Sequence, residues 1–291
     1  MTPDSSHAAA VLVTGVSSGI GEAVAEHLLE GGYRVFGSVR RPDDAQSLTQ
    51  RWPRTFTSLQ FDVTDTHAIA VAAARLREAL HGQGLAALVN NAGVSHAGPL
   101  EQQPMNEIRE VFEVNVFGSL AVTRAMLPLL RMPHGAAQAR GRIVNIGSVS
   151  GAITVPFMGA YSASKHAVEA VAQALRRELM PQGIEVTTIE PGFVRSRMFE
   201  KAAPQRAAER YAGTAYAAAW RQFNLSLLQQ EQAARSPETV ARAVRAAIEA
   251  RRPRTRHPLD PLWRIGRLLP DRGFDRLIFK ALGIASLMRP R

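Results

Sequence analysis

The chain has 291 residues, of which 46% are hydrophobic, enough for one sizeable core. It contains no cysteine, which excludes disulfides, thiolate metal sites and a cysteine nucleophile. The formal net charge is +10, but residues 251–291 hold eleven Arg and Lys against three Asp, which leaves only +2 for the first 250 residues. The basicity therefore belongs to a C-terminal segment, and we expect no nucleic-acid-binding surface on the body of the protein.

Residues 1–10 have no basic region ahead of an apolar stretch. No uncharged apolar run approaches the roughly 18 to 20 residues that span a bilayer. These two patterns predict a cytoplasmic protein, and we expect no bound metal.

Short, β-rich apolar runs alternate with longer Ala-rich helical stretches along most of the chain. The runs predicted as strands are residues 10–14, 34–39, 56–61, 85–90, 142–148 and 185–190, with a last short strand within 253–258. Continuous apolar runs such as Val11, Leu12 and Val13 are typical of a parallel sheet with helices on both faces. The predicted fold class is α/β, a doubly wound parallel sheet in a single domain.

Residues 198–250 form helical sequence without convincing strands. This stretch predicts a helical cover over one edge of the sheet, with substrate-covering helices at about 197–235. We place the catalytic domain at residues 8–258 and a basic C-terminal helical extension at 259–291.

A glycine cluster follows the first strand directly. Gly15, Gly19 and Gly21 allow a tight turn and close backbone approach, and a helical pattern begins within the cluster. The free N–H groups of the new helix suit a pyrophosphate. A plain turn into a helix is the alternative, but the strand before and the helix after favour dinucleotide binding.

Three further motifs follow in order: Asn90-Asn91-Ala92-Gly93, then Tyr161 and Lys165 four residues apart, and then Pro191-Gly192. Together with the Gly-x3-Gly-x-Gly turn, this set resembles the short-chain dehydrogenase/reductase family over residues 10–258. The nearest likeness is to the 17β-hydroxysteroid and retinol dehydrogenase-like branch. The resemblance implies a Rossmann-like oxidoreductase that works as a homodimer or homotetramer.

The end of the second predicted strand indicates which nicotinamide cofactor is used. Val39 stands where NAD-preferring relatives carry an acid that would repel a 2′-phosphate. Arg40 is then placed to meet that phosphate, with Ser18 adding a hydroxyl. Arg40 and Arg41 as ordinary solvated charges are the alternative, and the missing acid favours NADP(H).

The resemblance implies further cofactor contacts. Asp62 corresponds to an adenine-contacting acid, and its alternative role is a turn or a helix cap. Ser196 stands where many relatives place a threonine beside the carboxamide. The complete predicted cofactor set is Gly15, Ser17, Ser18, Gly19, Ile20, Gly21, Arg40, Asp62, Val63, Asn91, Ala92, Gly93, Tyr161, Lys165, Pro191, Gly192, Val194 and Ser196.

Tyr161 and Lys165 lie one turn apart on a helix predicted over 160–180. A free phenol has a pKa near 10, and a nearby ammonium favours the phenolate and lowers that pKa. Lys165 is therefore predicted to tune Tyr161, the acid/base. The resemblance adds Ser148 as a hydrogen-bonding partner of the substrate oxygen, Asn115 as the holder of a water that links Lys165 to solvent, and a ribose contact for Lys165.

The predicted substrate wall is mostly apolar, which favours a lipophilic ketone, aldehyde or alcohol. Its members are Ser148, Ile153, Phe157, Tyr161, Phe193 and Met198. An NADP(H)-dependent oxidoreductase is the main hypothesis. A catalytically weak NADP-binding sensor or scaffold is the alternative, and a nucleic-acid or membrane module that uses the tail is a distant third.

In the tail, apolar residues follow helical spacing at positions 274, 277, 278, 281, 282 and 285. This spacing predicts a basic amphipathic helix. The helix can pack on its own domain or on a second subunit, which we favour, or make peripheral contact with an anionic membrane surface.

Overall fold

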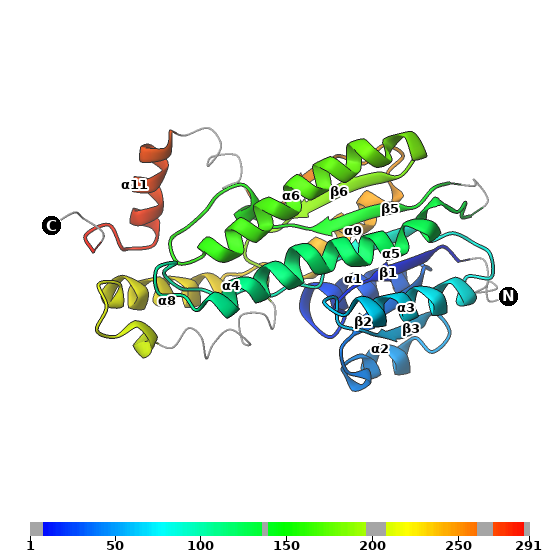
Figure 1. The fold of residues 1–291 in the computed structure, drawn as a ribbon, viewed down its shortest axis with the longest axis horizontal. Coiled ribbons are helices and arrows are strands. Elements are labelled where there is room, and N and C mark those ends of the chain that lie inside the picture. Colours follow the sequence, from blue (N-terminus) through cyan, green and yellow to red (C-terminus); the bar gives the residue numbers. More distant parts are fainter. Residues whose placement is uncertain (1–7, 136–138, 196–207, 261–269, 288–291) are drawn as a thin grey trace.

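The computed structural model describes residues 8–135, 139–195, 208–260 and 270–287. Within them, seven strands form one parallel sheet in the order β3-β2-β1-β4-β5-β6-β7 (Figure 1). The strands are β1 Ala10–Val13, β2 Arg34–Val39, β3 Phe56–Gln60, β4 Ala87–Asn90, β5 Arg142–Ile146, β6 Glu185–Glu190 and β7 Arg256–Pro258.

The longer helices are α1 Gly19–Glu30, α2 Gln46–Arg51, α3 Thr66–Ala79, α4 Met105–Phe112, α5 Ser119–Arg131, α6 Gly159–Leu179, α8 Ala217–Gln232, α9 Glu238–Glu249 and α11 Asp271–Ala281. Single turns of helix are η2 Pro42–Ala45, η3 Glu113–Gly118, η4 Val149–Gly151, η5 Met180–Gln182 and η6 Ala208–Tyr211.

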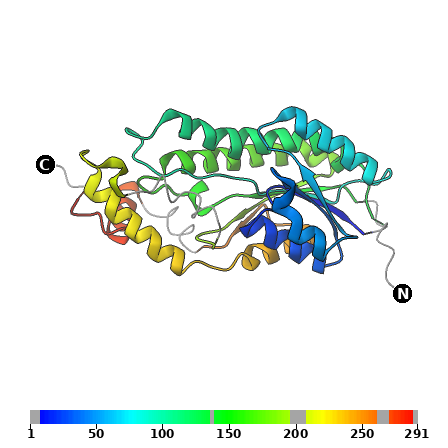
Figure 2. The ribbon, with the colours of Figure 1, turned by 90° about the horizontal axis from the view of Figure 1, so that it is seen from below.

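Helices cover both faces of the sheet (Figures 1 and 2). On one face, α1 and α9 pack against each other and against the strands, with Val24, Leu28 and Val244 in a shared core. On the other face, α3, α5 and α6 bury Leu76, Met126 and Ala172 in a second core. The predicted doubly wound α/β sheet is thereby confirmed.

Two strand boundaries differ from the prediction by two residues, and the first of them matters for the site. β5 ends at Ile146, so Ser148 lies in the loop beyond it. The Ser148 hydroxyl caps η4 by accepting a hydrogen bond from the Ser150 N–H at 3.1 Å, and this cap takes the chain out of the sheet. β4 begins at Ala87 and not at residue 85.

The predicted cover over residues 198–250 was too long. α8 lies beyond the sheet edge, but α9 packs on α1 under the sheet (Figure 2). The reason is a fully apolar face on α9, where Val240, Ala241 and Val244 are completely buried. The described part of the cover is therefore η6 and α8.

The last strand, β7, is held by ion pairs as well as by its backbone hydrogen bonds with β6. Arg256 on β7 forms ion pairs with Glu169 of α6 at 3.0 Å and with Glu190 of β6 at 3.1 Å. Both carboxylates are buried. The backbone contacts continue past residue 258, because the Leu259 N–H donates to the Glu190 carbonyl at 2.9 Å.

The tail helix α11 packs on the cover. Its Ile278 is buried together with Leu282 and Ile284 against Trp220 and Phe223 of α8. The Ser226 hydroxyl of α8 donates to the Leu282 carbonyl at 3.0 Å. The helix ends at Ala281, so position 285 of the predicted stripe lies beyond it. Of the predicted apolar stripe, Phe274, Ile278 and Leu282 pack with α8, whereas Leu277, Ala281 and Ala285 are exposed.

None of the helices in the described ranges has both the length and the apolar character that crossing a bilayer requires.

Candidate active site

A cavity of about 780 Å³ lies where the carboxyl ends of the strands meet, the place at which open α/β sheets bind ligands. Most of the residues predicted to bind cofactor or to catalyse line it. These are Gly15, Ser17, Ser18, Ile20, Gly21, Arg40, Asp62, Val63, Asn91, Ala92, Gly93, Ser148, Tyr161, Lys165, Pro191, Gly192 and Val194. The fold thus brings the separate motifs to one place.

The glycine turn is held by side chains from the neighbouring strand. Gly15 has a φ of 72°, and a Cβ on Gly21 would run into the Gly15 carbonyl, so both positions need glycine. The Asn91 amide donates to the carbonyls of Thr14 at 2.9 Å and Gly15 at 3.1 Å. Ser18 is the N-cap residue of α1, but its hydroxyl makes no cap hydrogen bond and faces the cavity. The hydroxyl is therefore available to a ligand.

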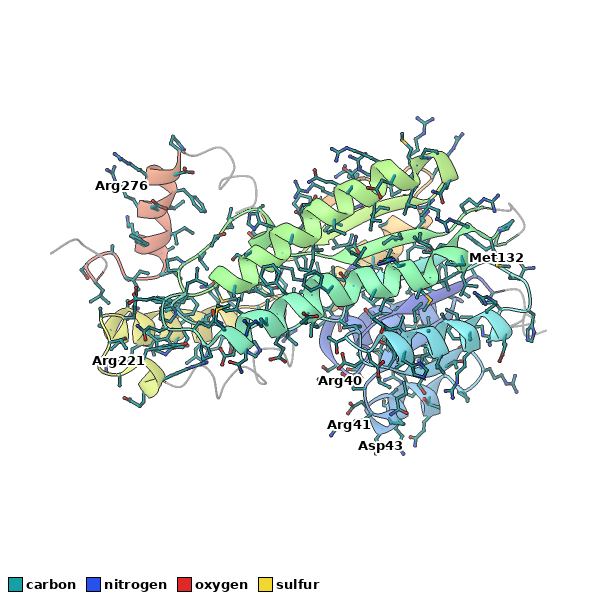
Figure 3. The ribbon with its side chains drawn as sticks, in the orientation of Figure 1. Arg40, Arg41, Asp43, Met132, Arg221 and Arg276 are labelled. Carbon is teal, nitrogen blue, oxygen red and sulfur yellow. The ribbon has the colours of Figure 1, made fainter. Side chains whose placement is uncertain are left out.

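The end of β2 carries the predicted phosphate contact. Arg40 lines the cavity and, within the described residues, its guanidinium has no hydrogen-bond or ion-pair partner. The Arg41 guanidinium, labelled near Arg40 in Figure 3, is instead bound to Asp44 at 2.8 Å. Val39 is buried at this end and is followed by Arg40, while Asp44, which also lines the cavity, is paired with Arg41. The two arginines therefore differ, and only Arg40 presents a charge to the cavity.

Asp62 performs its predicted turn role and also lines the cavity. One carboxylate oxygen accepts from the Thr64 N–H at 2.9 Å and from the Thr64 hydroxyl at 2.8 Å. The cap of α3 is Asp65, which accepts from the Ala68 N–H. Asp62 is thus held rigidly at the rim of the cavity beside Val63.

Tyr161, Ser148 and Lys165 lie together at the inner part of the cavity. Burial raises the pKa of the Tyr161 phenol, and a hydrogen bond with the Ser148 hydroxyl lowers it in part. The Lys165 ammonium lies 5.8 Å from the centre of the Tyr161 ring and donates to the Ile146 carbonyl at 2.9 Å. Burial lowers the pKa of Lys165 to about 8. The lowering of the Tyr161 pKa by Lys165 stays a prediction, since burial and Ser148 account for the shift of Tyr161.

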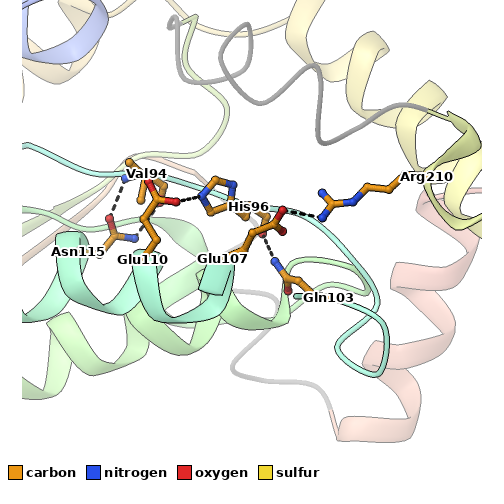
Figure 4. Close-up of polar contacts among 7 residues, drawn as sticks. All are labelled: Val94, His96, Gln103, Glu107, Glu110, Asn115 and Arg210. Atoms are coloured by element: carbon orange, nitrogen blue, oxygen red, sulfur yellow. Dashed lines mark hydrogen bonds and ion pairs between the residues drawn. The ribbon is translucent and has the colours of Figure 1, made fainter. Parts of the chain in front are cut away.

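Asn115 lies in η3, a turn of π-helix, and does not line the cavity. Its amide accepts from the Val94 N–H at 2.9 Å and donates to the Val94 carbonyl at 3.0 Å (Figure 4). It also donates to the Ser164 hydroxyl at 3.0 Å. Asn115 therefore positions the segment after the Asn-Asn-Ala-Gly motif, and its link to a water stays a prediction.

Two of the predicted substrate residues, Ser148 and Tyr161, line the cavity. Ile153, Phe157 and Phe193 are not among the residues that line it, and neither is Gly19 of the cofactor set. Phe157 packs in the aromatic core of the cover, with ring centres 5.7 Å from Trp220 and 5.2 Å from Phe223. Its φ of 67° is unusual for a non-glycine residue, so the core holds this backbone firmly. Ser196 and Met198 lie outside the described residues.

One wall of the cavity was not predicted from the sequence. It is formed by residues 94–96 and by polar side chains of α4 and η3: Val94, Ser95, His96, Asn106, Arg109, Glu110, Glu113 and Val114. His96 and Glu110 are joined at 2.8 Å, and Glu107 binds Arg210 of the cover at 2.6 Å (Figure 4). The available signal was the helical spacing of positions 106, 109, 110 and 113 shortly after the Asn-Asn-Ala-Gly motif.

Known proteins resemble this chain along most of its length. The short chain dehydrogenase family model matches residues 9–207. NADPH-dependent 3-dehydrocapnine reductase of Ornithobacterium rhinotracheale is 39% identical over 275 residues, covering 93% of this chain and 96% of that protein. Retinol dehydrogenase 16 of Mus musculus is 39% identical over 184 residues, covering 63% of this chain and 56% of that protein.

A solved structure agrees with these matches. A short-chain dehydrogenase from Streptomyces avermitilis superposes with a TM-score of 0.72 at 30% identity, covering 96% of this chain and 97% of the other. The match of the family model to residues 9–207 spans more than half of the chain. The protein therefore belongs to the short-chain dehydrogenase family and is an oxidoreductase.

Proposed function

We propose that this oxidoreductase uses NADPH to reduce a ketone or aldehyde on a lipophilic substrate, with Tyr161 as the proton donor. The observation that carries the proposal is the position of Tyr161, Ser148 and Lys165 in the same cavity as the glycine turn and Arg40. Because burial raises the pKa of Tyr161, the phenol keeps its proton at neutral pH. A protonated phenol suits reduction, in which the substrate oxygen must gain a proton.

The residues present fit a dinucleotide with a 2′-phosphate. Gly15 and Gly21 form a tight turn that has no room for a Cβ, and Ser18 lines the cavity with no side-chain cap bond to α1. The Arg40 guanidinium supplies a cation at the end of β2, where an acid would exclude the phosphate. When bound, the cofactor supplies the hydride. The name of the 3-dehydrocapnine reductase supports NADPH as its source.

The chain's own groups handle the substrate oxygen. Ser148 and Tyr161 would both donate hydrogen bonds to the carbonyl, which polarises it and fixes its position. Tyr161 then transfers its proton to the developing alkoxide. Lys165, with its ammonium beside the phenol, favours the resulting phenolate until solvent returns the proton. In oxidation of an alcohol the same groups would act in reverse.

The lipophilic character of the substrate is supported by the relatives of the chain. Retinol dehydrogenase 16, named for retinol, is among them. The aromatic core of the cover, formed by Phe157, Tyr211, Trp220 and Phe223, does not line the cavity and carries no part of this support. The name favours a substrate with a large apolar part over a sugar.

The test is a turnover screen of NADPH against long-chain and cyclic ketones and aldehydes, with Tyr161→Phe as the matched variant. We expect NADPH oxidation with at least one member of the panel and none with the variant. Stoichiometric NADPH binding without turnover of any carbonyl would instead favour a sensor or scaffold.

A further inference from the structure

One wall of the cavity belongs to a polar stripe that the proposed reaction does not use. Asn106, Arg109, Glu110 and Glu113 recur at helical spacing on α4 and η3, so they lie along one helix face. All four line the cavity together with His96. The cofactor phosphates have their own donors at the glycine turn and at Arg40, and the reacting carbonyl has Ser148 and Tyr161. The stripe is therefore available to bind a part of the substrate other than the reacting carbonyl.

Arg109 provides a cation in this wall. Its side chain is exposed and lines the cavity. Among the residues that the structure describes, no hydrogen bond or ion pair reaches its guanidinium. The neighbouring Glu107 does not neutralise it, because that carboxylate is bound to Arg210 at 2.6 Å. A guanidinium that faces a cavity in this way is suited to an oxyanion.

His96 forms another part of this wall and pairs with one of its carboxylates. It lines the cavity although the residue is only 8% exposed. Its Nε2 lies 2.8 Å from the Glu110 carboxylate, and its carbonyl accepts from the Gln103 amide at 3.3 Å, so the ring is firmly positioned (Figure 4). The Glu110 carboxylate is therefore paired within the wall, and Arg109 is the cation of this wall that has no described partner.

We propose that this end of the cavity is a subsite for an oxyanion carried by the substrate, held by the Arg109 guanidinium. The inference rests on the proposed reductase function and narrows its substrate to an amphiphilic ketone, apolar at one end and anionic at the other. The Glu110 carboxylate is engaged by His96. Glu113 lines the cavity one helical turn from Arg109.

The test compares straight-chain oxo acids, with the ketone at positions 4 to 8, with their methyl esters, which differ only in the charge. The wild-type enzyme should prefer the acid over the ester in kcat/KM for at least one ketone position. Arg109→Gln should reduce that preference by about tenfold, the loss of one charged hydrogen bond at a half-open site. Arg109→Lys should keep part of the preference, because it retains the charge. Arg75→Gln, which removes an exposed charge from α3, is the matched control and should keep all of it.

A binding measurement separates this proposal from the proposed reaction. Decanoate and methyl decanoate, neither of which has a ketone, are titrated into the protein with saturating NADP+. Tighter binding of decanoate that depends on Arg109 supports the subsite even if no carbonyl is turned over, in which case the reductase proposal alone fails. Turnover of esters with no advantage for acids, and no preference for decanoate, overturns the subsite and leaves the reductase. A loss of NADPH affinity in Arg109→Gln as large as the loss for the acid would place Arg109 on the cofactor and also overturn it.

Discussion

The ammonium of Lys165 donates a hydrogen bond to the carbonyl oxygen of Ile146 at 2.9 Å, and this lysine is only 7% exposed. One neutral acceptor does not replace the water that burial removes, so the pKa of Lys165 falls from 10.5 to about 8. The Lys165 ammonium, which is proposed to bind the cofactor ribose and to lower the pKa of Tyr161, therefore loses its charge near pH 8.

The first prediction concerns cofactor affinity. In the free enzyme, NADPH binding should weaken as the pH rises through about 8, because the Lys165 ammonium loses a proton and with it a charged donor. The dissociation constant would be measured by nicotinamide fluorescence from pH 6 to 10. Lys165→Ala should bind NADPH weakly and without this step. A step of equal size in that variant would contradict the assignment to Lys165.

The second prediction concerns stability. The unfolded lysine holds its proton up to a pKa of 10.5, and the folded one only to about 8. Below pH 8 the folded protein therefore carries the full free-energy cost of burying the Lys165 charge. Between pH 8 and 10.5 the unfolded state binds more protons than the folded state, so the free energy of unfolding rises with pH. Lys165→Met removes this cost but also a hydrogen bond. We expect a gain of about 1 to 2 kcal/mol in the free energy of unfolding at pH 7.

Denaturant unfolding of the wild type and of Lys165→Met at pH 7 and pH 10 measures this effect. The difference between the two proteins should shrink at the higher pH. A methionine variant that is less stable than the wild type at pH 7 would show that packing around Lys165 outweighs its desolvation.

The third prediction concerns Tyr161. Tyr161→Phe removes only the proton-transferring oxygen, so turnover should be abolished while NADPH affinity is nearly kept. Lys165→Ala should reduce NADPH affinity more than Tyr161→Phe does, because the lysine is also the proposed ribose contact. A phenylalanine variant that retains a tenth of the wild-type rate would remove Tyr161 from the mechanism. Equal NADPH affinity in the two variants would argue against the ribose contact.

The fourth prediction uses two adjacent arginines as test and control. Arg40 faces the cavity without a described partner, whereas Arg41 is bound to Asp44. Arg40→Ala should weaken NADPH binding by about tenfold, the effect of a charged hydrogen bond at an exposed site, and leave NADH nearly unchanged. Arg41→Ala should alter neither. A wild-type enzyme that prefers NADH would refute the assignment of the cofactor.

The fifth prediction concerns the tail helix. Ile278 is 8% exposed against α8, whereas its neighbour Leu277 is 40% exposed. Ile278→Ala should cost about 2 to 4 kcal/mol of unfolding free energy through lost burial and a cavity, and Leu277→Ala much less. Neither effect should depend on lipid. Thermal unfolding with and without anionic vesicles checks this.

Vesicle sedimentation tests the other arrangement of the tail. The full chain should remain in solution with anionic vesicles at low salt. Sedimentation that is reversed by salt, and abolished by deleting the residues after 270, would show that the basic tail binds membranes in addition to packing on α8.

Much of the sheet could be predicted because its signals are local. β2 and β6 have the predicted bounds, since each is a short run of mostly β-branched and aromatic residues that favours a strand locally. The glycine turn is likewise a property of a few adjacent residues, because Gly15 and Gly21 are required by backbone geometry. Tyr161 and Lys165 were predicted to meet because one helical turn separates them.

The sequence by itself therefore determined the sheet, the cofactor turn and the pair of Tyr161 and Lys165. Only the tertiary structure decided that α9 packs under the sheet, that Ile278 docks on α8, and that His96 and Arg109 share a wall of the cavity. An apolar helix face predicts that the face is buried, but it does not predict which element covers it, since hydrophobic burial is non-directional. The partner of a side chain such as Glu107, which binds Arg210 from a distant segment, depends on how whole helices pack.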